Sequence, residues 1–203
     1  MARSLLVSTG TSALMSGVLI LLMAMPAAGQ SSAELVDAPH CIVRLADADP
    51  TDKGGEGIIE EERCFTTFSA AFEYGSLGAI DVPADMSSAD LTQSLVLAAG
   101  AQSSSYLIGI NYDCKNFTTN WLCPSWSWFA SGPCSPTSGW YVNSVGSAQD
   151  NRYESVRTGY SYCKQVRVFE HINLQGANLH SWWERSDLGL LNNHTSSVRW
   201  WGY

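Results

Sequence analysis

From position 104 to the C-terminus, the apolar and polar positions follow a strand pattern with no helical period. Short segments rich in valine, isoleucine, tyrosine and tryptophan are separated by glycine, asparagine, proline and serine. Several short strands with turn residues between them indicate an antiparallel sandwich or barrel. The expected strands lie in SYLIGINYD, GWYVNSV, YESVRTGYSY, KQVRVFEH, ANLHSWW and SSVRWWGY.

The region 40–100 has a mixed pattern. CIVRL and GIIEEERCF are predicted as two short strands on either side of the turn-rich ADADPTDKGGEG. TTFSAAFEYGSLG predicts a short helix that begins at hydroxyl residues and ends at Gly75. DMSSADLTQSLVLAAG predicts a second helix, with Ser88 as its N-cap and Gly100 as its end. We therefore expect a small α+β segment over 40–100, followed by a β domain over 104–203.

The first 29 residues have the pattern of a secretory signal peptide. Arg3 gives a positive start, an apolar run follows, and small residues precede a cleavage site expected after Gly29. An N-terminal membrane anchor is the alternative, but the clean apolar run is short for a span, which needs about 20 residues. We expect a secreted, extracellular protein in which residues 30–39 are a flexible lead-in.

All six cysteines follow this segment, and an even number in an exported chain predicts three disulfides. Zinc binding is disfavoured because the chain has no Cys-x-x-Cys pair. Six cysteines allow fifteen pairings. The preferred set is Cys41–Cys64, which closes the N-terminal hairpin, Cys123–Cys134, which closes a loop, and the remaining pair Cys114–Cys163.

The charge balance narrows the choice of partners. The chain has 19 acidic and 11 basic residues, with a formal net charge of −8. Nucleic acids and anionic membranes bind proteins through clustered lysine and arginine, so neither is an expected partner. An acidic surface is compatible with a secreted protein and with cation binding.

Two parts of the C-terminal region repeat each other. DNRYESVR (150–157) matches NNHTSSVR (192–199), and LIGINYDCKNF (107–117) matches VRVFEHINL (166–174). The first unit is longer, with an insertion around WLCPSWSWFASGPC. A unit repeated twice suggests two similar supersecondary pieces that cover each other's apolar faces.

Each unit resembles a Greek-key motif of the βγ-crystallin superfamily. Such a motif opens with an aromatic and an acidic residue, as Phe169 and Glu170 do, and closes with an Asx pair, two free positions, Ser or Thr, and Ser. The second unit meets the closing pattern completely over 192–197, whereas the first has Thr119 at the corner glycine and Glu154 at the Ser/Thr position. The resemblance implies a mainly β fold, with two Greek-key motifs packed as a βγ-crystallin-like sandwich and preceded by a small α+β segment.

The resemblance also implies a calcium site. In the family, two such closing loops lie side by side and each Ca²⁺ takes oxygens from both; Ca²⁺ prefers six to eight oxygen ligands. Glu154 either strengthens a site through its charge or displaces the loop through its length. With few acidic ligands we expect Kd values on the order of 10⁻⁴ to 10⁻³ M. The implied ligands are Asp150, Asn151 and Glu154 of the first unit and Asn192, Asn193 and Ser196 of the second, and the further ligands are backbone carbonyls near Asp113, Arg152, Glu170 and His194.

The alternative interpretation of these loops is local. Asx-rich turns followed by serine often hydrogen-bond only to their own backbone.

Catalysis has little support in the sequence. None of the four histidines belongs to a His-Glu-x-x-His pattern, and no nucleophile elbow, P-loop or dinucleotide fingerprint is present. His171 beside Glu170 is expected to be part of a strand or loop rather than a catalytic dyad. We therefore expect a non-enzymatic protein in which calcium has a structural role.

Two alternative functions remain. Secreted bacterial members of the superfamily include metalloproteinase inhibitors, and a disulfide-clamped loop 123–134 would be the rigid inhibitory segment. Of the eight tryptophans, those alternating in WSW are expected to fill the core, but Trp182–Trp183 and Trp200–Trp201 must each expose one ring from a strand. Exposed indoles would suit a cell-wall glycan or a protein partner.

Overall fold

The computed structural model describes residues 40–47, 55–135, 139–160 and 162–202. The predicted signal peptide and the lead-in lie outside the described residues. No helix in the described ranges combines the length and the apolar character needed to cross a membrane.

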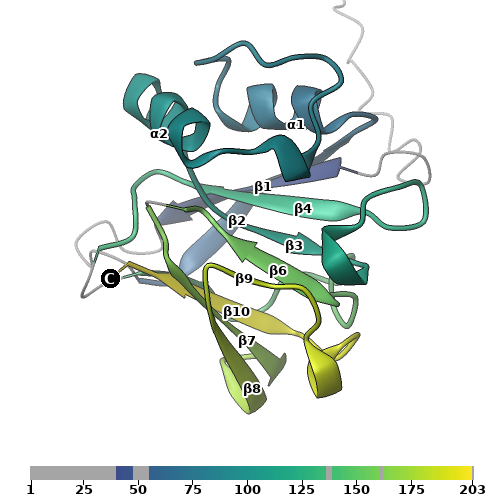
Figure 1. Cartoon of the computed structure of the whole chain (residues 1–203). Coiled ribbons are helices and arrows are strands. Elements are labelled where there is room, and N and C mark those ends of the chain that lie inside the picture. Colours follow the sequence, from purple (N-terminus) through teal and green to yellow (C-terminus); the bar gives the residue numbers. More distant parts are fainter. Residues whose placement is uncertain (1–39, 48–54, 136–138, 161, 203) are drawn as a thin grey trace, which may run out of the picture. The chain divides into compact units, whose positions relative to one another are not determined.

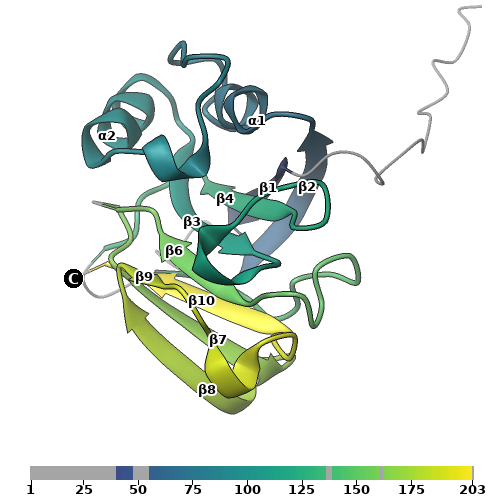
Figure 2. The same ribbon diagram turned by 45° about the vertical axis from the view of Figure 1, so that its right-hand side comes forward.

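The described chain forms three layers, with two helices on one face of a six-stranded sheet and a four-stranded sheet on the other (Figures 1 and 2). The helices are α1 (Phe68–Gly75) and α2 (Gln93–Gln102), and short 3₁₀ turns cover Ser88–Asp90, Lys115–Phe117 and Gly189–Leu191. The strands are β1 (His40–Asp47), β2 (Gly57–Phe65), β3 (Tyr106–Tyr112), β4 (Ser125–Ala130), β5 (Gly139–Val142), β6 (Ser155–Thr158), β7 (Gln165–His171), β8 (Gln175–Trp182), β9 (Glu184–Arg185) and β10 (Ser197–Trp201).

The two repeated units exchange their third strands. The first unit runs through β3, β4, β5 and β6, and the second through β7, β8, β9 and β10. The sheet orders are β2-β1-β4-β3-β6-β9 and β5-β10-β7-β8, so β5 joins the sheet of the second unit and β9 joins that of the first. Each unit is therefore a Greek key whose fourth strand lies beside its first. The predicted fold class, a mainly β sandwich of two Greek keys with a small α+β segment, is confirmed.

The segment 40–100 is built into this sandwich. Strand β1 pairs in parallel with β4, from His40 opposite Ser125 to Leu45 opposite Ala130, and β2 pairs antiparallel with β1 at the edge. The predicted strands and helices of this segment are present, but they extend the sheet of 104–203 instead of forming a separate piece. Both segments belong to one compact unit.

The core between the sheets follows the two-residue period of the strands. Trp128 of β4 and Trp200 of β10 are both fully buried, and their ring centroids are 5.1 Å apart. Val43 and Val168 bury their side chains in the same layer. The expectation that the tryptophans of WSW fill the core is confirmed, since Trp126 is buried as well.

A second core lies between the six-stranded sheet and the helices. Phe72 of α1 packs against Phe129 of β4, with ring centroids 6.1 Å apart. Gly75 ends α1 beside the same ring, and a Cβ added there would lie 2.2 Å from the Phe129 ring. The predicted helix end at Gly75 is confirmed, and Thr67 caps the other end by accepting a hydrogen bond from Ala70 N.

The predicted boundaries of the second helix were wrong at both ends. Ser88 starts a short 3₁₀ turn, which Ser87 and Asp90 close as a capping box, and extended backbone at Leu91 stops it. Helix α2 begins later, where Thr92 accepts a hydrogen bond from Leu95 N. The helix continues past Gly100 to Gln102, and the glycine lies close to Tyr162, since a Cβ at this position would be 2.5 Å from the Tyr162 hydroxyl.

One of the three predicted disulfides is confirmed and two are corrected. Cys41–Cys64 joins β1 to β2 as expected, but the other pairs are Cys114–Cys123 and Cys134–Cys163. The residues between Cys123 and Cys134 form β4, whose six residues span about 20 Å. A disulfide cannot join two Cα atoms more than about 7 Å apart, so the strand keeps these cysteines from pairing.

The same finding removes the predicted inhibitory loop. Every residue of β4 is buried in the middle of the six-stranded sheet. The segment 123–134 is therefore not an exposed loop clamped by its own disulfide.

Candidate functional site

The two units lock their opening hairpins with equivalent serines. Ser155 and Ser197 are both fully buried, and each donates its hydroxyl proton to one carbonyl and accepts one backbone N–H from the hairpin of its own unit. The four bonds are Ser155 Oγ to Cys114 O (2.6 Å), Phe117 N to Ser155 Oγ (3.2 Å), Ser197 Oγ to His171 O (2.6 Å) and Leu174 N to Ser197 Oγ (3.1 Å). Residues that the sequence repeat aligns therefore occupy equivalent positions in the two units.

The closing loops of the two units face each other. We call residues 150–155 the first corner and residues 192–197 the second corner. Asn151 N donates to Thr195 O (3.0 Å), and Asn193 N donates to Tyr153 O (2.9 Å). Both asparagines have left-handed backbone angles, with φ of 59° and 57°, a conformation that asparagine tolerates. The Asx positions of the repeat therefore allow a reciprocal contact between the corners.

Each corner is also tied to the opening strand of its own unit. Glu154 N donates to Tyr112 O and Ser196 N donates to Phe169 O, both at 2.9 Å. This places Asp113, which follows Tyr112, beside the first corner, and Glu170, which follows Phe169, beside the second.

The acidic groups of the first corner are bound by the protein's own donors. A carboxylate oxygen of Glu154 accepts a hydrogen bond from the Asn193 amide at 2.7 Å, and the Asp113 carboxylate forms an ion pair with Arg152. The guanidinium of Arg152 also lies 5.3 Å from the centroid of the Trp126 ring. Glu154 thus reaches across to the opposite corner, and a cationic side chain already occupies the space beside Asp113.

The second corner leaves oxygen atoms available. The hydroxyl of Ser196 makes no hydrogen bond to any described residue, although its side chain is largely buried. Asn151 directs its amide N–H toward Asp150 (3.1 Å), which leaves its carbonyl oxygen as an acceptor. Glu170 accepts a hydrogen bond from Ala177 N at 3.1 Å. The contact between the corners therefore offers the Ser196 hydroxyl of the second corner, the Asn151 amide oxygen of the first, the neighbouring Glu170 carboxylate and backbone oxygens.

The side chain of Asn192 is bound to Asp187 and is not among the available oxygen ligands. Its amide N–H donates to a carboxylate oxygen of Asp187 at 2.8 Å, and Gly189 N donates to the same oxygen at 2.7 Å. The backbone bond from Gly189 first, and then the bonds from Asn192 and Lys115, lower the pKa of Asp187 to about 2. Asn192 therefore serves the turn before the second corner, and its own carbonyl oxygen is buried without a partner among the described residues.

These contacts decide how well the residues fit a calcium ion. No group of three or more His, Cys, Asp or Glu side chains in the described ranges could hold a metal ion. The first corner does not fit, because Arg152 pairs with Asp113 and Glu154 is bound to Asn193. The second corner fits better, since calcium accepts hydroxyl, amide and carbonyl oxygens and the Ser196 hydroxyl has no protein partner there.

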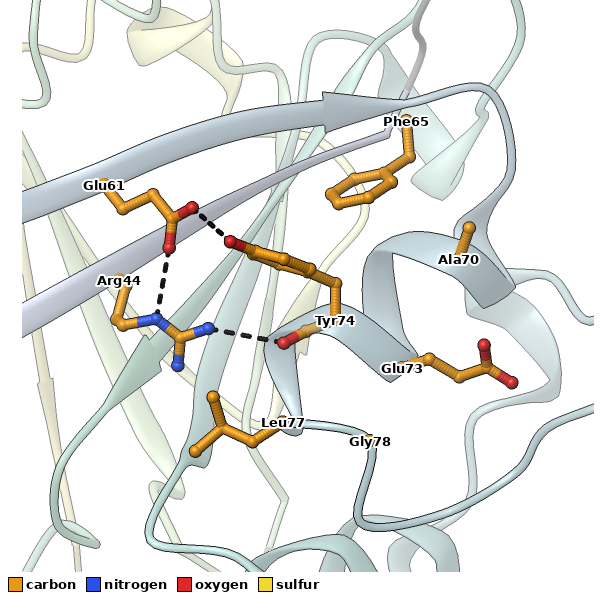
Figure 3. A pocket seen from close by; sticks show the side chains of 8 residues that line it. All are labelled: Arg44, Glu61, Phe65, Ala70, Glu73, Tyr74, Leu77 and Gly78. Atoms are coloured by element: carbon orange, nitrogen blue, oxygen red, sulfur yellow. Dashed lines mark hydrogen bonds and ion pairs between the residues drawn. The ribbon is translucent and has the colours of Figure 1, made fainter. Parts of the chain in front are cut away.

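The pocket in Figure 3 lies between β1, β2 and α1 and has a volume of about 620 Å³. Arg44 donates to Glu61 (3.4 Å) and to the carbonyl of Tyr74 (3.3 Å), and the Tyr74 hydroxyl donates to Glu61. These polar groups satisfy one another and fasten α1 to the sheet. The lining residues are Arg44, Glu61, Phe65, Ala70, Glu73, Tyr74, Leu77 and Gly78.

The pair His171 and Glu170 is open to solvent. Their nearest charged atoms are 3.9 Å apart, and their side chains are 62% and 39% exposed. A catalytic dyad needs a closer contact and a site that excludes water. This pair offers neither.

The tryptophan pairs behave differently from each other. Trp200 is buried while Trp201 is partly exposed on the opposite face of β10, as the strand period predicts. Trp182 and Trp183 are both exposed, because Trp183 leaves the strand with a φ of 67°. Trp121, in the loop closed by the disulfide Cys114–Cys123, is exposed as well.

No family model matches the chain, and no curated protein sequence is significantly similar to it. Several solved structures are similar to its sandwich. A βγ-crystallin from an archaeon is 19% identical, with a TM-score of 0.32, and the match covers 46% of this chain and 96% of that one. The N-terminal domain of protein S is 14% identical, with a TM-score of 0.33 and coverages of 47% and 96%.

A βγ-crystallin domain of the abundant perithecial protein from Neurospora crassa, solved in the Ca²⁺-bound form, is 20% identical to this chain. Its TM-score is 0.33, and the match covers 46% of this chain and 88% of that domain. At these identities the similarity concerns the fold alone.

Proposed function

We propose that this protein, whose exchanged Greek keys form a βγ-crystallin-like sandwich, is a secreted, non-enzymatic protein that calcium stabilises at its second corner. The observation that carries the proposal is the Ser196 hydroxyl, which lies at the contact between the corners without a protein partner among the described residues. Calcium, when bound, supplies a divalent charge that holds oxygens of both corners. The carbonyl oxygen of Asn151 and backbone oxygens near Glu170 and His194 are the further ligands we assign.

In the first corner, the Arg152 guanidinium occupies the place of a bound cation. Arg152 neutralises Asp113 there, and the bond from Asn193 to Glu154 joins the two corners directly. Because side chains already neutralise the acidic groups of the first corner, an ion is needed only at the second corner. We therefore propose one calcium ion per chain.

The disulfides support export. All six cysteines are paired, and such pairs persist in oxidising compartments outside the cytosol. Together with the signal-peptide pattern, they favour an extracellular protein.

A calorimetric calcium titration of the oxidised mature chain tests the proposal. We expect one ion per chain with Kd on the order of 10⁻⁴ to 10⁻³ M. Ser196→Ala should weaken binding at least tenfold, because it removes a ligand oxygen from a site with few ligands. Thr118→Ala is the matched control, since Thr118 is an exposed hydroxyl outside both corners. The proposal is overturned if the wild type releases no heat at millimolar calcium, or if Ser196→Ala binds as the wild type does.

A further inference from the structure

The outward face of the four-stranded sheet is basic and aromatic in an otherwise acidic chain. This face points away from the helices and the other sheet (Figures 1 and 2). Arg199 of β10 lies opposite Tyr141 of β5 and Arg167 of β7, and Arg167 lies opposite His180 of β8. One row of cross-strand neighbours therefore presents two arginines, a tyrosine and a histidine to solvent.

The two arginines have no ion-pair partner among the described residues, although one acid lies at the end of their row, where Glu56 pairs with Tyr141 and accepts a hydrogen bond from Asn143 at 2.8 Å. Like charges directly opposite each other on neighbouring strands destabilise a sheet. The residues directly opposite the two arginines on the neighbouring strands, Tyr141 and His180, carry no negative charge, and neither Arg167 nor Arg199 forms an ion pair in the described part of the chain. The Nε atom of Arg167 is buried and has no hydrogen-bond partner there. An anion that binds between the two guanidinium groups would offset this cost.

An aromatic row lies beside the arginines. The guanidinium carbons of Arg167 and Arg199 are 5.6 and 5.8 Å from the centroid of the Trp201 ring. His180 stacks on Trp201 with centroids 5.1 Å apart, and Trp182, which is 48% exposed, follows at 5.9 Å from His180. The charged row and the indole rings therefore form one continuous surface.

The surface is held rigidly. Gln165, between Trp201 and Trp182 in the register, lies 2.9 Å from His180 Nε2 and donates to the carbonyl of Gly202 at 3.2 Å. Burial first, and then the charge of Arg167, lower the pKa of His180. His180 is therefore less protonated at pH 7 than an ordinary histidine, and the positive charge of the row comes mainly from the two arginines.

We propose that this face binds an acidic polysaccharide, with sugar rings stacked on the exposed indoles and carboxylates paired with Arg167 and Arg199. Aromatic rings stack on sugars, and the planar guanidinium of arginine matches a carboxylate in two hydrogen bonds. The indole row and the arginine row are two residues apart along the strands, about 7 Å, a distance that neighbouring sugar units bridge. A single-stranded nucleic acid fits less well, because its dense phosphates need many positive charges and the chain carries a net charge of −8.

The site is separate from the paired corners, so the inference does not rest on the proposed calcium site. Its test is accordingly performed in EDTA. The oxidised mature chain is run by affinity electrophoresis through gels that contain polygalacturonate, alginate or heparin. We expect retardation by at least one of them, and none by fully methyl-esterified polygalacturonate, which has the same backbone without the charge.

Variants locate the site. Arg167→Gln/Arg199→Gln and the single change Trp182→Ala should each weaken binding at least tenfold. The matched control Arg63→Gln/Arg185→Gln removes the same charge from the other sheet and should bind as the wild type does. Circular dichroism checks that each variant is folded, and Trp182→Ala removes a ring that is 48% exposed. Retardation by none of the three polysaccharides, equal retardation by the esterified form, tighter binding to single-stranded DNA, or a loss in the control pair would each overturn the proposal.

Discussion

At the scale of single residues, the repeat is clearest where one residue type makes the same bonds twice. Ser155 and Ser197 close equivalent hairpins, and Asn151 and Asn193 take the same left-handed conformation at the corners. The sequence repeat predicted these equivalences. It could not predict that Arg152 would pair with Asp113, because that contact depends on how the side chains of one corner are directed.

The two serines provide a matched pair of substitutions. Ser155→Ala and Ser197→Ala should each lower the free energy of unfolding by about 1–3 kcal/mol, because each leaves buried backbone groups unpaired. Thr118→Ala is the control, and as an exposed hydroxyl it should change the free energy by less than about 0.5 kcal/mol. Urea denaturation of the oxidised protein measures the three values. A large loss for one serine and none for the other would contradict their equivalence.

His40 makes the stability depend on pH. Burial lowers the pKa of His40 to about 4, below its ordinary value of 6.5. Between these values the unfolded chain binds a proton that the folded chain does not, so stability should fall as the pH is lowered from 6.5 to 4. His180 has a lowered pKa and contributes with the same sign.

The variant His40→Gln should therefore have a smaller loss of stability between pH 6.5 and pH 4.5 than the wild type. Thr118→Ala, which changes an exposed hydroxyl that does not titrate, is the control and should keep the wild-type slope. Urea denaturation at the two pH values gives the slopes. If His40→Gln loses as much stability as the wild type, burial of His40 is not the cause.

At the scale of elements, the strand alternation and the helix caps predicted most of the secondary structure. The error at β4 had a physical origin. Tryptophans and small residues between Cys123 and Cys134 suggested a loop closed by a disulfide. A central strand that is buried on both faces, as β4 is, can have the same composition. Disulfide pairing could not be predicted without knowing that this strand separates Cys123 from Cys134.

Peptide mapping tests the pairing directly. Trypsin cuts after Arg63, Lys115, Arg152, Arg157 and Lys164, so Cys123 and Cys134 fall in one peptide, 116–152. Without reduction, the structure predicts that this peptide stays linked both to 64–115, through Cys114, and to 158–164, through Cys163. Release of 116–152 as a free peptide would instead support the pairs Cys123–Cys134 and Cys114–Cys163.

At the scale of the whole molecule, the sandwich was predictable and its extension was not. The two Greek keys follow from a repeat that is visible in the sequence. The parallel contact between β1 and β4 joins residues more than 80 positions apart, and no local pattern encodes such a pairing. The helices then cover the far face of the extended sheet, where Ile42 and Phe129 would otherwise be exposed.

The candidate site, too, could be predicted only in part. The repeat placed the two corners face to face, as the reciprocal bonds of Asn151 and Asn193 require. The difference between a first corner closed by Arg152 and a second corner open at Ser196 appeared only with the side chains in place.

The central claim is that calcium completes the second corner and thereby stabilises the fold. Thermal unfolding of the oxidised mature chain, in EDTA and in calcium at ten times Kd, tests it most directly. Binding to the folded state alone adds about 1.4 kcal/mol under these conditions, which corresponds to a rise in Tm of about 3–6 °C. We predict this rise for the wild type and for Thr118→Ala, and a rise of no more than about 1–2 °C for Ser196→Ala, whose binding is at least tenfold weaker; an unchanged Tm in the wild type would contradict the account.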